Sequence, residues 1–176
     1  MPAGLLYERD FISAPEEAAL LAELGRLPLQ EAKYKAYTAR RRIAVFGSAY
    51  DFETYELGPA PPLPAFLEPL KKRVSQLIGV SPDAFPHALV NEYRPGTPLG
   101  WHRDVPEFEL VAGVSLAGAC RMRFRPYPPK KGAKVFSLDV EPRSVYVLRD
   151  EIRWRWQHSV AATRELRYSI TFRTRR

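Results

Sequence analysis

The spacing of apolar residues predicts two helices in the first half of the chain. Ser13 and Glu16 form a capping box, with a hydroxyl at the cap and a carboxylate three residues later. Apolar residues follow at helical spacing, so we expect a helix over about 14–26. A second apolar stripe, beside two lysines and an arginine, predicts a helix over about 64–79, in which Pro69 is a candidate kink.

The stretch between these helices, residues 33–64, has a different character. It is rich in tyrosine and arginine and ends in a cluster of prolines. Its pattern is typical of neither a regular helix nor a packed core. Long irregular segments inside a domain are often functional, so we interpret this stretch as a substrate lid.

From His87 onward the pattern changes to short β runs separated by turn residues. Each run alternates in polarity or is rich in branched and aromatic residues; the runs are HALVNEY, ELVAGVSLA, RMRFRPY, AKVFSLDV, SVYVLRD, WRWQHSV and LRYSITFR. Several short strands after two helices predict an α+β fold that is mainly β. The expected architecture is an antiparallel sandwich or barrel supported by the N-terminal helices.

Length and composition fit one domain. The chain has 176 residues, 45% of them hydrophobic, which is enough for a single core. We expect one domain over 1–176, with helices and lid in 1–86 and the β core in 87–176. No stretch approaches the roughly 20 apolar residues of a membrane span, and the N-terminus lacks a signal-peptide pattern. With one cysteine, Cys120, no internal disulfide can form, and we expect a cytoplasmic monomer without a membrane partner.

Charge is distributed unevenly along the chain. The net charge is +7, but residues 1–120 carry 12 Lys and Arg against 15 Asp and Glu, whereas residues 121–176 carry 15 against 5. A basic C-terminal third is a footprint of nucleic-acid binding, although basic solvated faces without a partner are also common.

Two nearby side chains are candidate metal ligands. On a continuous strand, His102 and Asp104 would point to the same face. A third ligand must come from elsewhere, and the other two histidines are His87 and His158. His87 opens a strand and is more easily explained as a structural residue. Two histidines and a carboxylate form the facial triad of non-haem Fe(II) sites. A His-x-Asp pair alone is weak evidence, since it also fits an ordinary turn.

The last predicted strand adds a more unusual feature. In LRYSITFRTRR, Arg167 and Arg173 lie on the same side of the strand, opposite Tyr168, Ile170 and Phe172. If that polar side faces solvent, it needs no explanation. If it faces inward, two buried guanidinium groups need anionic partners.

Four elements occur together in a fixed order: Asn91-x-Tyr93, His102-x-Asp104, His158, and Arg167 followed by Arg173. Together they resemble the signature of the AlkB family of Fe(II)- and 2-oxoglutarate-dependent dioxygenases, and RDEIRWRWQHSV is similar to the family's approach to its distal histidine. The resemblance covers about residues 87–175. It implies a double-stranded β-helix, or jelly roll, with the metal at its open mouth.

The resemblance also implies roles for individual residues. His102, Asp104 and His158 would be the catalytic Fe(II) ligands. Arg167 would pair with the distal carboxylate of 2-oxoglutarate and Arg173 would lie near its chelating carboxylate, since a guanidinium matches a carboxylate bidentately. The remaining cosubstrate contacts would be hydrogen bonds from Asn91, Tyr93 and Ser169, where Ser169 replaces an asparagine of the best-studied members.

The implied chemistry is oxidative demethylation. Decarboxylation of 2-oxoglutarate by O2, to succinate and CO2, would be coupled to hydroxylation of an N-methyl group, which then leaves as formaldehyde. AlkB-like repair enzymes act on alkylated DNA or RNA bases, which are usually flipped into a pocket with aromatic walls. Candidate contacts to phosphates or bases are Arg40, Arg41, Arg42, Tyr37, Phe46, Tyr50, Phe52, Trp101, Arg121, Arg123 and Arg125.

One position departs from the nucleic-acid repair pattern. Those members commonly carry an acidic base contact two residues after the iron-binding aspartate, where this chain has Pro106. Glu107 or Glu109 is a candidate replacement, and Trp101, Trp154 and Trp156 are candidate pocket walls or core residues. The alternatives to nucleic-acid demethylation are the same chemistry on a protein or small molecule, and a non-catalytic jelly roll that binds nucleic acid.

Overall fold

The computed structural model describes residues 2–34 and 37–176, and the side chains of residues 34, 37 and 38 are outside the description. Three α-helices are described: α1 (Ala14–Leu24), α2 (Glu68–Ile78) and the short α3 (Asp150–Trp154). Two 3-10 turns cover Ala65–Leu67 and Pro82–Ala84. The strands are β1 (Leu5–Glu8), β2 (Gln30–Tyr34), β3 (Tyr37–Phe46), β4 (Ser48–Asp51), β5 (Glu56–Pro59), β6 (His87–Tyr93), β7 (Leu99–His102), β8 (Phe108–Ala117), β9 (Cys120–Pro126), β10 (Phe136–Val140), β11 (Val145–Leu148), β12 (Trp156–Val160) and β13 (Arg167–Arg175).

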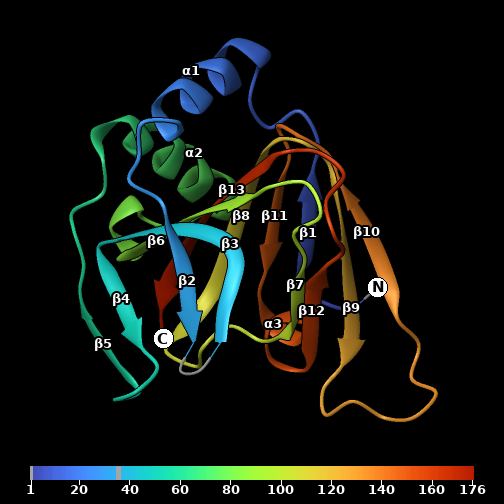
Figure 1. Cartoon of the computed structure of the whole chain (residues 1–176). Helices are drawn as coiled ribbons and strands as arrows, with labels where there is room; N and C mark the ends of the chain where they lie inside the picture. Colours follow the sequence, from blue (N-terminus) through green and yellow to red (C-terminus); the bar gives the residue numbers. More distant parts are fainter. Residues whose placement is uncertain (1, 35–36) are drawn as a thin grey trace.

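Two antiparallel sheets form the body of the molecule (Figure 1). The larger sheet has the order β1-β11-β8-β13-β6-β3-β2, and the smaller has the order β10-β9-β12-β7. Their inner faces enclose a core that includes Tyr93 and Leu148 from the larger sheet and Met122, Phe124 and Val160 from the smaller. This is the expected jelly roll, and it places both faces of most central strands in contact with protein.

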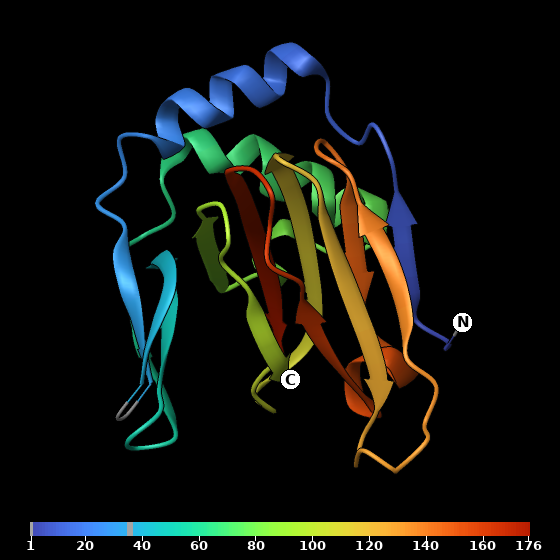
Figure 2. The ribbon, with the colours of Figure 1, turned by 45° about the vertical axis from the view of Figure 1, so that its right-hand side comes forward.

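The two predicted helices cover the outer face of the larger sheet (Figure 2). Ser13 caps α1 as expected, accepting a hydrogen bond from the Glu16 amide, while the Glu16 carboxylate accepts one from the Ser13 amide. Leu24 of α1 and Val74 of α2 are fully buried against strands that include β13, whose Ile170 is also fully buried. Pro69 lies in the first turn of α2, where its missing N–H costs no helical hydrogen bond, so it does not kink the helix. None of the described helices is long and apolar enough to cross a bilayer.

The segment that was expected to be an irregular lid consists largely of β-strands. β2 and β3 extend the larger sheet beside β6, and Phe46 at the end of β3 is buried in the helix-side core. Only β4 and β5 form a separate hairpin. The local pattern missed these strands because the partner that pairs with β3, namely β6, lies about 45 residues further along the chain.

Two expectations about strands near the candidate ligands are also corrected. Residues 150–154 form α3, so Trp154 lies outside the strand that was predicted over WRWQHSV and that carries Trp156 and His158. β7 ends at His102, so Asp104 lies beyond the strand and its direction is set by the turn that follows.

Candidate metal centre and substrate cavity

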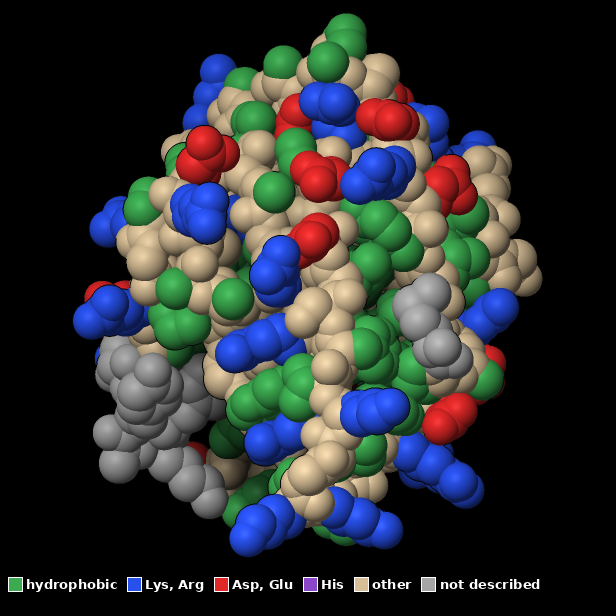
Figure 3. All heavy atoms as spheres, turned by 90° about the vertical axis from the view of Figure 1, so that its right-hand side faces the viewer, with side chains coloured by type: hydrophobic (Ala, Val, Ile, Leu, Met, Phe, Trp, Pro, Cys, Tyr) green, Lys and Arg blue, Asp and Glu red, His purple; other side chains and the backbone are tan. Residues whose placement is uncertain are grey.

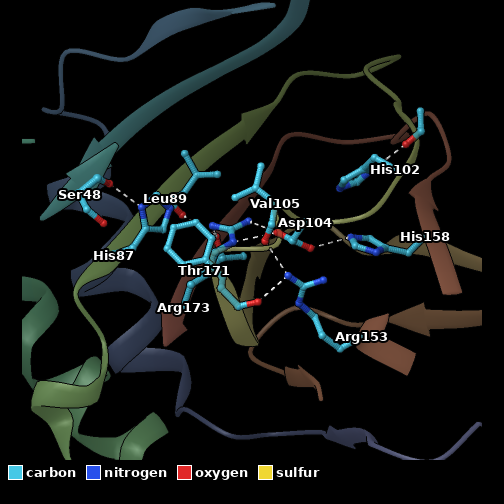
Figure 4. Close-up of polar contacts among 12 residues, drawn as sticks. Ser48, His87, Leu89, His102, Asp104, Val105, Arg153, His158, Thr171 and Arg173 are labelled. Carbon is cyan, nitrogen blue, oxygen red and sulfur yellow. Dashed lines mark hydrogen bonds and ion pairs between the residues drawn. The ribbon is translucent and has the colours of Figure 1, made fainter. Parts of the chain in front are cut away.

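The three expected metal ligands meet at one end of the smaller sheet (Figure 4). His102 on β7 is directly paired with His158 on β12, and their ring centroids are 4.2 Å apart. One ligand atom from each histidine and from Asp104 lie within 4.8 Å of one another. Two imidazoles and one carboxylate are the donor set of the facial triad, so the described residues fit an Fe(II) ion at this position.

Hydrogen bonds set the direction of these ligands. His102 donates from Nδ1 to the Gly100 carbonyl at 2.9 Å, which leaves its Nε2 with a lone pair for a metal. Arg173 holds Asp104, with Nε and Nη2 lying 2.8 and 2.7 Å from Oδ1. The other carboxylate oxygen, Oδ2, lies 3.7 Å from His158 Nε2.

The turn that carries Asp104 is fixed from α3. Arg153 is buried, and its Nη2 donates to the carbonyls of Val105 and Phe108 at 2.7 and 2.5 Å. These two carbonyls lie at the beginning and the end of the turn that joins Asp104 to β8, so Arg153 holds both sides of that turn. Sequence reasoning missed this role of Arg153, because the residue lies between two predicted strands and was given no role, although an arginine so close to the distal histidine was a signal.

Electrostatics keep the three ligands in their metal-binding forms. Burial lowers the pKa of His158 to about 3, with a further contribution from His102. Burial likewise lowers the pKa of His102. Burial opposes ionisation of Asp104, but the positive charge of Arg173 offsets it, and the pKa of Asp104 lies below its usual value. Neutral imidazoles and an ionised carboxylate are what a metal ion requires.

A small cavity of about 50 Å³ adjoins the ligands between the two sheets. Asn91 and Tyr93 from β6 and Arg167 from β13, three of the residues predicted to contact the cosubstrate, line it. Arg167 is 1% exposed; its Nε donates to Ser115 Oγ at 2.9 Å, while its buried Nη1 has no hydrogen-bond partner among the described residues. A buried guanidinium with an unsatisfied donor fits the carboxylate of 2-oxoglutarate. Ser169 is buried on the same side of β13, opposite Asn91, but does not line the cavity.

A larger cavity of about 440 Å³ opens from the metal ligands toward β3 and the β4–β5 hairpin. Tyr50 and Phe52 line it, with ring centroids 5.0 Å apart in an edge-to-face arrangement. Arg41 is buried and lines both cavities. His87 lies outside the metal ligand group, as expected, but lines the larger cavity.

The structure separates the three consecutive arginines of β3. Arg41 faces the cavities, whereas Arg42 points to the other side of the strand and donates to both carboxylate oxygens of Glu92, each at 2.8 Å. Arg40 is exposed and does not line either cavity. Among the aromatic candidates, Phe46 is a core residue, and the side chain of Tyr37 lies outside the described residues.

Four other candidates lie on the outer face of the smaller sheet and do not line either cavity: Trp101, Arg121, Arg123 and Arg125. His102 points inward, so its neighbour Trp101 points outward, where the Arg123 guanidinium carbon is 5.2 Å from the indole centroid. Pro106 is exposed and also lies outside the larger cavity, and Glu109 accepts a hydrogen bond from Trp154 at 3.1 Å. Trp154 and Trp156 do not line the larger cavity.

Comparisons with known proteins agree with this site. A family model described as the 2OG-Fe(II) oxygenase superfamily matches residues 4–173. An uncharacterised protein of Acanthamoeba polyphaga mimivirus is 29% identical over 190 residues, which cover 97% of this chain and 84% of that protein. The alkylated DNA repair protein ALKBH8 homolog of Arabidopsis thaliana is 28% identical over 181 residues, covering 89% of this chain but only 50% of that protein. The probable RNA/DNA demethylase ALKBH6 of Danio rerio is 25% identical over 169 residues, covering 90% and 70%.

Solved structures show the same fold at low sequence identity. OsALKBH1 superposes with a TM-score of 0.77 at 16% identity, over 99% of this chain and 98% of that chain. A Pseudomonas putida prolyl-4-hydroxylase superposes with a TM-score of 0.61 at 17% identity, over 98% and 93%. The chain therefore belongs to the 2OG-Fe(II) oxygenase superfamily and is a dioxygenase of the AlkB type, with Fe(II) and 2-oxoglutarate as its cofactor and cosubstrate.

Proposed function

We propose that this dioxygenase demethylates N-alkylated bases of DNA or RNA. The observation that carries the proposal is the larger cavity, which starts at the candidate metal ligands and is lined by Tyr50, Phe52 and Arg41. Its volume of about 440 Å³ lies in the range of small-molecule sites. Enzymes that modify a base flip it into a pocket of this kind.

In this proposal the chain's own residues bind and orient the reactants. His102, Asp104 and His158 hold the metal, and Arg173 keeps the Asp104 carboxylate in place. Arg167 anchors the distal carboxylate of 2-oxoglutarate, with Asn91 and Tyr93 beside it. The bound iron supplies the oxidising power for cleavage of a C–H bond.

The overall reaction balances without any further reductant. The N-methyl base, 2-oxoglutarate and O2 give the N-hydroxymethyl base, succinate and CO2. The hydroxymethyl group then leaves as formaldehyde, and its proton returns to the base nitrogen. No nucleophilic side chain or general-base pair is required.

The test measures succinate formation and loss of methyl groups in the same reaction. Single-stranded DNA and RNA oligonucleotides, each with one N-methylated base, are incubated with the Fe(II)-loaded protein, and the oligonucleotide mass is followed. We expect a loss of 14 mass units per methyl group, matched by succinate, and neither product with His158→Ala. Succinate formation without a mass change in any methylated oligonucleotide would contradict the nucleic-acid assignment.

A second candidate substrate is a protein side chain or a small molecule. The observation that favours it is Pro106, which stands where repair members have an acidic base contact and which does not line the larger cavity. A search of treated cell extract for mass changes of +16 or −14 distinguishes the two. Changes confined to peptides or metabolites would favour the second candidate.

A further inference from the structure

The outer face of the smaller sheet carries a set of arginine and aromatic side chains that the cavities do not use. Along β9, Cys120, Met122 and Phe124 point into the core, so Arg121, Arg123 and Arg125 point outward. Figure 3 shows this side of the molecule, where blue Lys and Arg side chains gather over the lower part of the view.

The outward arginines differ in how their charge is balanced. Arg121 is paired with Asp139 on β10, with Nε 2.8 Å from Oδ1, and both side chains are largely exposed. Arg123 donates from Nε to Ser159 Oγ at 3.1 Å, and Arg125 donates from Nε to Gln157 Oε1 at 2.8 Å. These two acceptors are neutral, so the hydrogen bonds orient the guanidinium groups without cancelling their charge.

Both oriented arginines extend across β12 to the edge strand β7. The guanidinium carbons of Arg123 and Arg125 lie 5.2 and 4.5 Å from the ring centroid of Trp101. An arginine held over an indole is in a favourable cation–π position and keeps donors available for a ligand. Trp101 thus joins the two arginines into one rigid patch.

A third arginine connects this patch to the mouth of the larger cavity. Arg103 lines that cavity, and its guanidinium carbon lies 3.7 Å from the ring centroid of Tyr127, at the end of β9. Arg103 donates to the backbone carbonyl of Trp154 at 3.1 Å, which is again a neutral acceptor. We define the outer basic face as Trp101, Arg103, Arg123, Arg125 and Tyr127.

The charge continues beyond Tyr127. The loop over residues 127–135 projects past the end of the sheet (Figures 1 and 2) and carries Lys130, Lys131 and Lys134, all exposed, with no acidic residue in its sequence. A chain of phosphates that lies on the outer basic face therefore meets positive charge from the loop to the cavity mouth.

We infer that the outer basic face binds the sugar–phosphate backbone of a single-stranded nucleic acid and leads one base around the edge strand β7 into the larger cavity. This inference rests on the proposed function and names the surface that holds the polymer outside the cavity. Single-strand binders combine a basic track with aromatic side chains, and both are present here. β7 separates the two regions by one residue, since Trp101 points outward and His102 points inward.

The test is the affinity of the full-length protein for unmodified, labelled single-stranded oligonucleotides as a function of salt, measured by fluorescence anisotropy. Arg123→Gln combined with Arg125→Gln should weaken binding about 10-fold or more at 0.1 M salt and lower the slope of log K against log salt by about 0.7 per lost contact. The matched control, Arg26→Gln combined with Lys72→Gln, removes two positive charges from the helix side of the molecule, one just after α1 and one on α2, and should leave both values unchanged. Equal affinity and slope for the two double variants would overturn the inference.

A gain of affinity gives a test that misfolding cannot imitate. Asp139→Asn removes the carboxylate that pairs with Arg121 on the same sheet face, so it should tighten oligonucleotide binding and steepen the salt dependence. Weaker or unchanged binding would contradict the inference. Polyglutamate and anionic vesicles are added as competitors of the labelled oligonucleotide. If either displaces it as strongly as an unlabelled oligonucleotide does, the inference is overturned in favour of a general anionic partner.

Failure of this inference can be told apart from failure of the proposed function. If the enzyme demethylates oligonucleotides and the Arg123/Arg125 double variant has the same KM as the parent protein, the backbone binds elsewhere and the proposed function stands. If oligonucleotides bind through these arginines but no base loses a methyl group, the inference about the outer basic face is supported and the proposed reaction is wrong.

Discussion

At the scale of single residues, Asp104 links most of the charged groups of the candidate metal centre. Its carboxylate contacts Arg173 through Oδ1 and lies near His158 through Oδ2. Arg153 donates hydrogen bonds to the carbonyls of Val105 and Phe108, which follow Asp104 in the chain. A buried carboxylate needs such partners to stay ionised, and the same partners leave one of its oxygens directed at the histidines.

The first prediction concerns Arg41, the one arginine of β3 that lines both cavities. Arg41→Gln should raise the KM for a methylated oligonucleotide about 10-fold, because the variant loses a charged hydrogen-bond donor worth about 1.5–3 kcal/mol. The neighbouring variant Arg40→Gln removes the same charge from an exposed side chain and should have unchanged kinetics. Steady-state kinetics of both variants check this, and identical KM values would refute it.

The second prediction concerns Gly113 on β8. A Cβ atom at this position would lie 2.3 Å from Cζ of Tyr146, whose ring is buried and lines the smaller cavity. Gly113→Ala should therefore displace that ring, lower the affinity for 2-oxoglutarate, and reduce the free energy of unfolding by about 1–3 kcal/mol. Gly58→Ala is the control, because a Cβ there meets nothing within 4 Å. Unfolding and cosubstrate titrations that do not differ between the two variants would contradict the packing argument.

At the scale of elements, β3 is held to β6 by more than backbone pairing. Arg42 and Tyr168 both donate to the Glu92 carboxylate, and Arg94 lies 3.2 Å from it. Glu92 thus ties together β3, β6 and β13 on the side of the sheet away from the cavities. This contact is the physical reason that Arg42 is unavailable to a phosphate.

The third prediction follows from the pKa of Glu92, which the hydrogen bond from Arg42 lowers despite an opposing effect of burial. A lowered pKa in the folded state means that the charged form stabilises the fold. That stabilisation is complete above the ordinary glutamate pKa of about 4.5 and is lost as the pH falls through the lower pKa of Glu92 in the folded protein.

Glu92→Gln should therefore reduce the free energy of unfolding at pH 7 by about 1–3 kcal/mol. The difference from the parent protein should shrink below about pH 4.5, where the glutamate of the unfolded chain takes up its proton. Denaturant unfolding at several pH values measures this difference. A gap that stays constant down to pH 3.5 would show that the carboxylate charge has no such role.

At the scale of the whole molecule, the candidate centre is assembled from both sheets. His102 and His158 belong to the smaller sheet, whereas Arg167 and Arg173 belong to the larger one. A metal ion with 2-oxoglutarate would therefore connect the two sheets at their open end. Such a ligand stabilises the folded state because the unfolded chain cannot assemble the site.

The fourth prediction is that Fe(II) with 2-oxoglutarate, added without oxygen, raises the midpoint of thermal unfolding. The expected gain is about 2.7 kcal/mol when the ligand is present at 100 times its dissociation constant. Removal of the metal with a chelator should reverse the shift, and His158→Ala should abolish it. An unchanged midpoint in the parent protein would mean that the sheets are not joined in this way.

Local patterns in the sequence determined those features that depend on neighbours in the chain. The capping box and apolar spacing predicted α1 and α2, and the alternation in β13 predicted that Arg167 and Arg173 share a face. These properties need no knowledge of distant contacts. The set of three metal ligands, by contrast, was implied by the resemblance to the AlkB family, because His102 and Asp104 alone also fit an ordinary turn.

The tertiary structure decided the features that depend on a distant partner. β3 became a strand because it pairs with β6, and Arg42 was separated from Arg41 by Glu92, 50 residues away. The sheet also decided that Trp101 lies outside while His102 lies inside, and that Arg121 is neutralised by Asp139 whereas Arg123 is not. Alternation along a strand states which residues share a side, but only the packing of the two sheets determines which side is the interior.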